Sequence, residues 1–189
     1  MKMKAEVERA AELAGGLLRH TGSRVAHVRE VANSARMLAD SLGLDSEVLV
    51  SAAWLHDIGY SREVRETGFH PLDGARHLRS LGWDERIVCL VAHHSCARFE
   101  AALRGLDAEH AEFVRPSTAY EDALCYCDMT NGPTGDPVIA PDRLDEIQER
   151  YGEGHIVTRF VEAARPEILA SVERVEQRLR LSESRASGR

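Results

Sequence analysis

Apolar residues recur every three or four positions along most of this chain, the spacing that places them on one face of an α-helix. The clearest stripe ends before Gly43 and consists of Val25, Val28, Ala32, Ala35, Leu38 and Ala39. Residues 48–55 are apolar almost all round, so we expect them to form a central helix. No segment shows the alternation typical of a strand. The pattern therefore predicts an all-α fold, a bundle of about eight to nine helices.

Turn and capping signals divide the chain into these helices. The expected ranges are 5–18, 25–42, 46–58, 71–81, 84–94, 97–113 with a break at Gly105, 118–129, 141–151 and 155–181. The strongest loop signal is the run NGPTGDP at residues 131–137. We interpret residues 1–181 as a single domain and predict that the polar residues 182–189 form a disordered tail.

Composition and charge narrow the classes of function. The net charge of -7 argues against nonspecific nucleic-acid binding, which needs a basic surface. A small phosphorylated ligand stays compatible with it, because a bound metal reverses the field locally. No apolar run is long enough to span a bilayer, and the N-terminus lacks a signal-peptide core, so we expect a cytoplasmic protein. The spacing of the four cysteines favours buried free thiols.

The candidate chemistry begins with the doublet His56-Asp57, which directly follows the apolar run. A carboxylate and an imidazole at the end of a buried helix would cost several kcal/mol unless they are paired or bind a cation. A metal ion resolves this, because it neutralises the aspartate and accepts the lone pair of a neutral imidazole. Adjacent helical residues face different ways, so both can reach one ion only at a distorted helix end, which Gly59 allows.

Other histidines and an aspartate lie where they can join this doublet. They are His27, His70, the pair His93-His94 and Asp128. Several fall at helix ends, which can converge in space into a cluster of nitrogen and oxygen ligands. Taken singly, each is more often a surface or core residue than a ligand. A metal-free hydrogen-bond network is also open as an explanation. His20, His77, His110 and His155 are interpreted as residues outside the site, with His77 the most doubtful of them.

The ordered set His27, His56-Asp57 and Asp128 resembles the HD superfamily of metal-dependent phosphohydrolases, over residues 24–130. The motifs that carry the resemblance are HVREVANSARMLADSLGLD, WLHDIGY, HPLDGARHLRSLG and VAHHS. It implies an HD-domain helical bundle in which these four residues bind one metal. In a binuclear subgroup, additional histidines hold a second metal and the aspartate of the doublet bridges both. His70 and one or both of His93 and His94 match those histidines. The segment after the His pair lacks the GYP motif of the cyclic dinucleotide phosphodiesterases, which argues against that substrate.

The resemblance implies a metal-dependent phosphohydrolase that cleaves a phosphate ester or phosphoanhydride, of a nucleotide, by a metal-activated hydroxide. We expect two divalent transition metals, Mn, Fe, Co or Ni, with Zn or Mg also compatible with the ligand types. Asp57 would be the catalytic residue that sets the spacing of the metals. Arg62, Arg65 and Arg98 are candidates for binding the phosphate, although a solvated charged surface explains them equally well.

Two other functions stay open at this point. Some HD-fold proteins with the same ligand order are mixed-valent di-iron oxygenases, and a metal-bound nucleotide-binding module is the second alternative. The amphipathic terminal helices also allow a homodimer.

Overall fold

The computed structural model describes residues 2–187, with side chains for residues 6–184. Within that range every regular element is helical, which confirms the all-α prediction, and an isolated β-bridge joins Asn131 and Pro137. The elements in order are α1 (Lys2–Leu18), α2 (Arg24–Leu42), α3 (Ser46–Leu55), the 3₁₀ helix η1 (Ile58–Tyr60), α4 (His70–Ser80), α5 (Glu85–His93), the 3₁₀ helix η2 (His94–Cys96), α6 (Arg98–Arg104), α7 (Asp107–His110), α8 (Thr118–Met129), α9 (Ala140–Tyr151) and α10 (Ile156–Ser187).

Local capping signals place the ends of these helices close to where the sequence predicts them. The side chain of Asp45 accepts hydrogen bonds from the backbone N–H groups of Glu47 and Val48 at the start of α3. Asp84 does the same for Arg86 at the start of α5. Such caps satisfy N–H groups that have no partner within the helix. Pro71 lies in the first turn of α4, where its missing N–H costs nothing.

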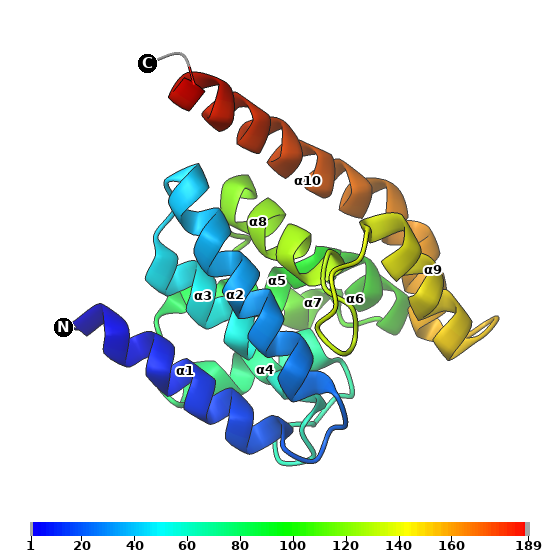
Figure 1. Ribbon diagram of the computed structural model, residues 1–189. Helices are drawn as coiled ribbons and strands as arrows, with labels where there is room; N and C mark the ends of the chain where they lie inside the picture. The colour runs from blue at the N-terminus through cyan, green and yellow to red at the C-terminus, as the bar shows by residue number, and fades with distance from the viewer. Residues whose placement is uncertain (1, 188–189) are drawn as a thin grey trace.

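The apolar helix α3 forms the centre of the larger hydrophobic core. It packs against α1 and α2 and also contacts α5 and α8 (Figure 1). Leu49, Ala52 and Leu55 on this helix are fully buried. Burial of one leucine side chain contributes about 1.5–3 kcal/mol, so α3 is a rigid base for the residues that follow it.

The chain does not continue α3 up to Gly59 as the sequence predicts. The α-helix ends at Leu55, and Ile58–Tyr60 form the 3₁₀ helix η1. A Cβ at Gly59 would lie 2.0 Å from the backbone oxygen of His70, so only glycine allows η1 to approach α4 this closely. This contact brings the ends of α3 and α4 together, and with them the doublet and His70.

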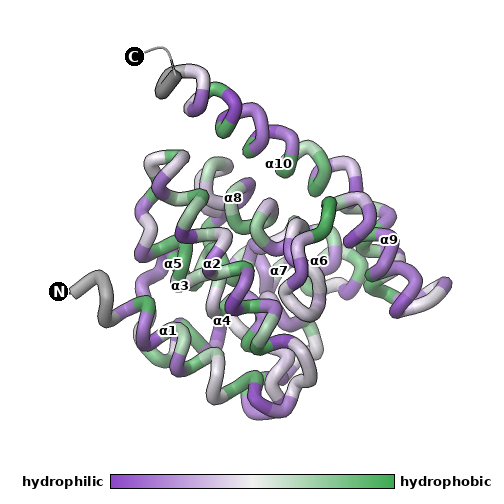
Figure 2. The backbone as a smooth tube through the Cα atoms, in the orientation of Figure 1, coloured by the Kyte–Doolittle hydropathy of each residue, from purple (hydrophilic) through white to green (hydrophobic). Residues whose placement is uncertain are grey.

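A second hydrophobic cluster joins α8, α9 and α10. Its fully buried members are Leu144, Val161, Ala164 and Ile168. Hydrophobic and hydrophilic residues alternate along α10, as expected of a helix with one buried face (Figure 2). This cluster attaches α9 to the bundle beside the end of α8, where Asp128 lies.

Three further sequence predictions can be compared with the structure. Helix α10 continues to Ser187, so residues 182–187 are helical rather than disordered. The hydroxyls of Ser182 and Ser184 donate to the backbone oxygens of Leu179 and Arg180, which satisfies these polar groups inside the helix. All four cysteines are free and buried, as predicted. Within residues 2–187, none of the helices combines the length and the apolar character that crossing a membrane requires.

Candidate metal centre

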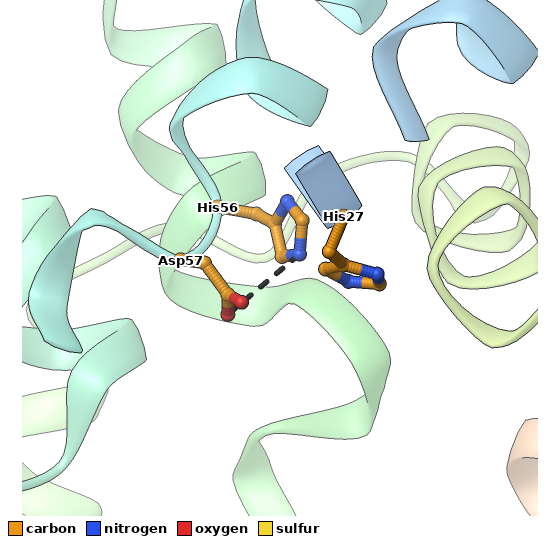
Figure 3. Close-up of side chains that lie close together, drawn as sticks. All are labelled: His27, His56 and Asp57. Carbon is orange, nitrogen blue, oxygen red and sulfur yellow. Dashed lines mark ion pairs between the residues drawn. The ribbon is translucent and has the colours of Figure 1, made fainter. Parts of the chain in front are cut away.

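Five helices, α2, α3, α4, α5 and α8, and η1 converge on a group of histidines and aspartates. His27 lies in the first turns of α2, and His56 and Asp57 connect α3 to η1. In Figure 3 the side chains of His56 and Asp57 reach toward one another, with His27 beside them. Asp128 lies at the end of α8. The helix-end distortion that the sequence requires is present, because Asp57 has left the helical region with φ -101° and ψ 2°.

The first set of potential ligands is His27, His56 and Asp57, whose donor atoms all lie within 4.8 Å of one another. Asp128 adjoins this set, since its Oδ1 is 3.1 Å from Nε2 of His27 and 3.8 Å from Nε2 of His56. All four residues are buried. Two carboxylates and two imidazoles at this spacing are a ligand set suited to a divalent transition metal.

The second set shares Asp57 with the first and adds His70 and His94, again with donor atoms within 4.8 Å of one another. Nε2 of His70 is 3.5 Å from Oδ1 of Asp57 and 3.1 Å from Nε2 of His94. One carboxylate, that of Asp57, therefore belongs to both sets of potential ligands.

The structure separates the two adjacent histidines at the end of α5. His94 points into the cluster, whereas Nε2 of His93 lies 2.9 Å from the backbone oxygen of Phe113 and its ring packs on that of His110. His93 is therefore not brought together with the other candidates. The reason is the helical spacing: neighbouring residues project about 100° apart, so only one can face the cleft.

Backbone carbonyls orient three of the imidazoles. Nδ1 of His27 donates to Gly132 at 2.9 Å, Nδ1 of His56 to Ala53 at 2.7 Å, and Nδ1 of His94 to Val91 at 2.6 Å. A proton on Nδ1 places the lone pair of each ring on Nε2, the atom that points into the cluster. Hydrogen bonds of this kind are what metal-binding histidines commonly make with their second nitrogen.

One nitrogen of this cluster lacks a hydrogen-bond partner among the described protein atoms. Nε2 of His56 is fully buried and has no hydrogen-bond partner among the described residues. A buried nitrogen lone pair without a partner is unfavourable, and a cation beside it would supply the missing interaction. The donor set and this unsatisfied atom therefore both fit a metal ion.

Electrostatics keep the carboxylates ionised. Burial alone would raise the pKa of Asp57, but the charge of Arg24, followed by that of His56, holds it well below its usual value. For Asp128 burial is likewise opposed, by the hydrogen bond from His27, and its pKa is lowered. Burial would lower the pKa of His27, yet its hydrogen bond to Asp128 raises it overall.

The pKa values of the two histidines in the second set are lowered rather than raised. Burial, reinforced by the neighbouring His94, holds the pKa of His70 well below its usual value. Burial and the nearby His56 lower the pKa of His94. Both rings are therefore neutral at pH 7, the form in which imidazole binds a metal.

Several residues around the cluster have no signature in the sequence. Arg24, one turn before His27, donates to Oδ2 of Asp57 and stacks over the ring of Tyr60, with its guanidinium carbon 3.3 Å from the centroid. The hydroxyl of Ser95 donates to Oδ2 of Asp128. Arg24 lies one turn before His27, and Ser95 directly follows His94. These positions are the only sequence signal for either residue.

The cleft above the cluster contains arginines other than the predicted ones. Arg24, Arg143 and Arg150 line it. Arg65 is exposed and lines an adjoining cavity of about 320 Å³, which also borders Tyr60 and His70. Arg62 is exposed and lines neither space. Arg98 faces away from the cleft, with its guanidinium 3.9 Å from Glu167 on α10.

The fold and the cluster together define an all-helical protein with a His/Asp site suited to divalent metals. The family model for the HD domain matches residues 24–130, more than half of the chain. The chain therefore belongs to the HD domain family, whose members are typically metal-dependent hydrolases. The matched segment contains every residue of the cluster.

Parts of this chain are also similar to curated proteins. The chain is 38% identical over 71 residues to Ribonuclease Y of Rubrobacter xylanophilus, covering 37% of this chain and 14% of that protein. It is 31% identical over 99 residues to Ribonuclease Y of Mycoplasma mycoides subsp. mycoides, covering 51% and 19%. A tRNA (cytidine(56)-2'-O)-methyltransferase of Picrophilus torridus is 30% identical over 130 residues, covering 67% and 35%.

The matched region thus spans less than a fifth of either Ribonuclease Y and about a third of the methyltransferase. No solved structure gives a significant match.

Proposed function

We propose that this protein is a metal-dependent phosphohydrolase that cleaves a phosphate ester or phosphoanhydride of a nucleotide. The observation that carries the proposal is the geometry of Asp57, which belongs to two adjacent three-residue sets of metal ligands. The unsatisfied Nε2 of His56 supports it, because this atom needs a cation beside it.

The residues present fit two divalent ions. His27, His56, Asp57 and Asp128 would hold one, and Asp57, His70 and His94 the other. Such ions supply Lewis acidity and a hydroxide nucleophile at neutral pH, and they neutralise the charge of a phosphate. The ligand types favour Mn, Fe, Co or Ni over Ca or Mg.

The protein itself supplies orientation and charge around these ligands. The backbone carbonyls at Gly132, Ala53 and Val91 hold the rings of His27, His56 and His94 so that the metal-binding nitrogens converge. Arg24 lines the same cleft, and the N–H groups that it does not use on Asp57 suit phosphate oxygens. These groups are preorganised, so they would stabilise developing charge without reorganising during the reaction.

Two relatives bear the name Ribonuclease Y, and RNA is linked by phosphate esters between nucleotides. This similarity favours a substrate that contains a nucleotide phosphate. The net charge of -7 makes a small nucleotide a better candidate for this chain than a long polyanion.

The test is a product screen with defined metals. The metal-free protein would be loaded separately with Mn, Fe, Co and Ni and offered nucleotides, dinucleoside polyphosphates and sugar phosphates, with and without oxygen. Asp57→Ala removes the shared ligand, and Asp40→Ala removes an exposed carboxylate on the outer side of α2 as a matched control.

We expect oxygen-independent release of phosphate or a nucleotide by the unaltered protein and by Asp40→Ala, and none by Asp57→Ala. Turnover that requires both iron and oxygen would instead establish an oxygenase. Nucleotide binding without any product, at full metal occupancy, would establish a binding module.

A further inference from the structure

Helix α9 contributes two arginines to the wall of the cleft. Arg143, Ile147 and Arg150 are spaced at i, i+4 and i+7, so they lie on one face of the helix, and all three line the space above the metal ligands. This helix begins at Ala140, beyond the segment 24–130 that matches the HD domain. Its arginine face is therefore a feature of this chain that the family match does not account for.

Arg143 has a buried donor group that no protein atom satisfies. The residue is only 7% exposed, and its Nη1 pairs with Glu146 on the same helix. Its Nε is buried without a hydrogen-bond partner among residues 2–187. Because Arg143 also lines the cleft, an anion that enters the cleft can supply an acceptor to this incompletely paired guanidinium.

Arg150 is the exposed partner of Arg143 on this face. Its Nε lies 3.5 Å from Glu146, the same carboxylate that pairs with Arg143. Its guanidinium carbon lies 5.2 Å from the ring centroid of Tyr151, which also lines the cleft. Two guanidinium groups thus share one carboxylate, which leaves an excess of positive charge on this side of the cleft.

The acidic residues of the cleft do not cancel this excess. Asp57 and Asp128 belong to the histidine cluster, and Glu100 pairs with Arg104 at 2.6 Å. Arg24 pairs with Asp57, so Arg143 and Arg150 supply the positive charge that is left over in the cleft of a protein whose net charge is -7. Positive charge in the cleft of an acidic protein attracts anions. It favours an anion whose negative charge is larger than the metal centre alone can neutralise.

We propose that the arginine face of α9, Arg143 and Arg150, binds a second phosphoryl group of the substrate, one anhydride bond away from the phosphoryl group at the metal centre. The substrate class is then a phosphoanhydride, such as a nucleoside di- or triphosphate, rather than a monoester. Guanidinium groups suit this role, because their paired N–H donors match the oxygens of a phosphate. The proposal rests on the proposed phosphohydrolase function and specifies its substrate.

The test measures binding, so it does not depend on turnover. Two probes that the enzyme cannot hydrolyse, inorganic phosphate and methylenediphosphonate, would be titrated calorimetrically into the manganese-loaded full chain with free Mn²⁺ buffered. The variants are Arg143→Met and Arg150→Met. Arg36→Met is the matched control, because Arg36 is exposed on α2 and lies about 18 Å along the helix from Arg24.

The expected result is tighter binding of methylenediphosphonate than of phosphate by the unaltered protein. Each of the two α9 variants should weaken methylenediphosphonate about tenfold or more, as expected for loss of a charge-assisted hydrogen bond, and change phosphate less than about threefold. Arg36→Met should change neither, and manganese stoichiometry should be the same in all forms. Because Arg150 is exposed, its variant tests the proposal even if Arg143→Met does not fold.

The outcomes separate this proposal from the proposed function. Equal binding of the two probes, or equal weakening of both in the α9 variants, would overturn the second phosphoryl site while leaving the phosphohydrolase intact. Absence of phosphate binding at full manganese occupancy would overturn both.

Discussion

Ser95 connects the end of α5 to the candidate metal ligands through a single hydrogen bond. It directly follows His94, is 7% exposed, and its hydroxyl donates to Oδ2 of Asp128. The opposite oxygen of Asp128 faces His27 at 3.1 Å. Ser95 therefore fixes which way the carboxylate turns, and we predict that Ser95→Ala weakens both folding and metal binding.

The magnitude follows from the kind of bond that is lost. A hydrogen bond to a charged group contributes about 1.5–3 kcal/mol to the free energy of unfolding. For a chain of this length that is a fall in melting temperature of about 3–12 °C in the metal-free protein. Loss of a residue that orients a metal ligand typically lowers metal affinity about 10–100-fold.

A second variant, Ser95→Gly, separates the loss of the hydroxyl that orients Asp128 from the backbone strain at position 95. Its φ of 47° lies in the left-handed region, which costs a residue with a Cβ about 1–2 kcal/mol and glycine far less. Ser95→Gly loses the same hydroxyl but relieves that strain. It should therefore match Ser95→Ala in metal affinity while being less destabilised.

The assay is titration of Mn²⁺ into metal-free protein, together with urea unfolding in the presence of a chelator. Ser51→Ala is the matched control, because Ser51 is fully buried in α3 and its hydroxyl has no partner within the described part of the chain. That variant should keep both its metal affinity and its stability. Unchanged manganese affinity in Ser95→Ala would refute the reasoning, since the carboxylate would then be oriented without the hydroxyl.

Three further predictions follow from the placement of single side chains. His94→Asn should lose one of two bound metals by elemental analysis, whereas His93→Asn should keep both, because His93 faces Phe113 instead of the cluster. Burial lowers the pKa of His93 to about 4, so the unfolded chain takes up a proton first as pH falls below about 6.5. Urea unfolding without metal should therefore show stability falling between pH 6.5 and 4, by at most about 1.4 kcal/mol per pH unit from this residue. His93→Gln should flatten that slope. Arg98→Met should leave KM unchanged in steady-state assays, since Arg98 faces Glu167 rather than the cleft.

The helices were predictable because their signals are local. Asp45, Asp84 and Pro71 mark helix starts by chemistry that acts within one turn, and the apolar stripes require only the period of the helix. The exceptions are informative. The end of α3 depends on the close approach of Gly59 to α4, and the helical state of residues 182–187 has no strong local marker.

The ligand candidates were predictable for a different reason. A histidine and an aspartate that follow an apolar run are costly unless something compensates them, so their presence marks a site. The choice between His93 and His94 was not predictable. It depends on the rotation of α5 about its axis, and packing against the rest of the bundle decides that rotation.

The sequence by itself thus determined the helical architecture and the candidate ligands, apart from the choice between His93 and His94. Only the tertiary structure decided that Asp57 is shared between two sets of potential ligands, that Arg24 donates to Asp57 and Ser95 to Asp128, and that Arg143 lines the same cleft from α9. The physical reason is the distance along the chain over which each interaction acts. Capping and periodicity act over a few residues, whereas these contacts join segments from 13 to more than 80 positions apart, for which the chain pattern carries no signal.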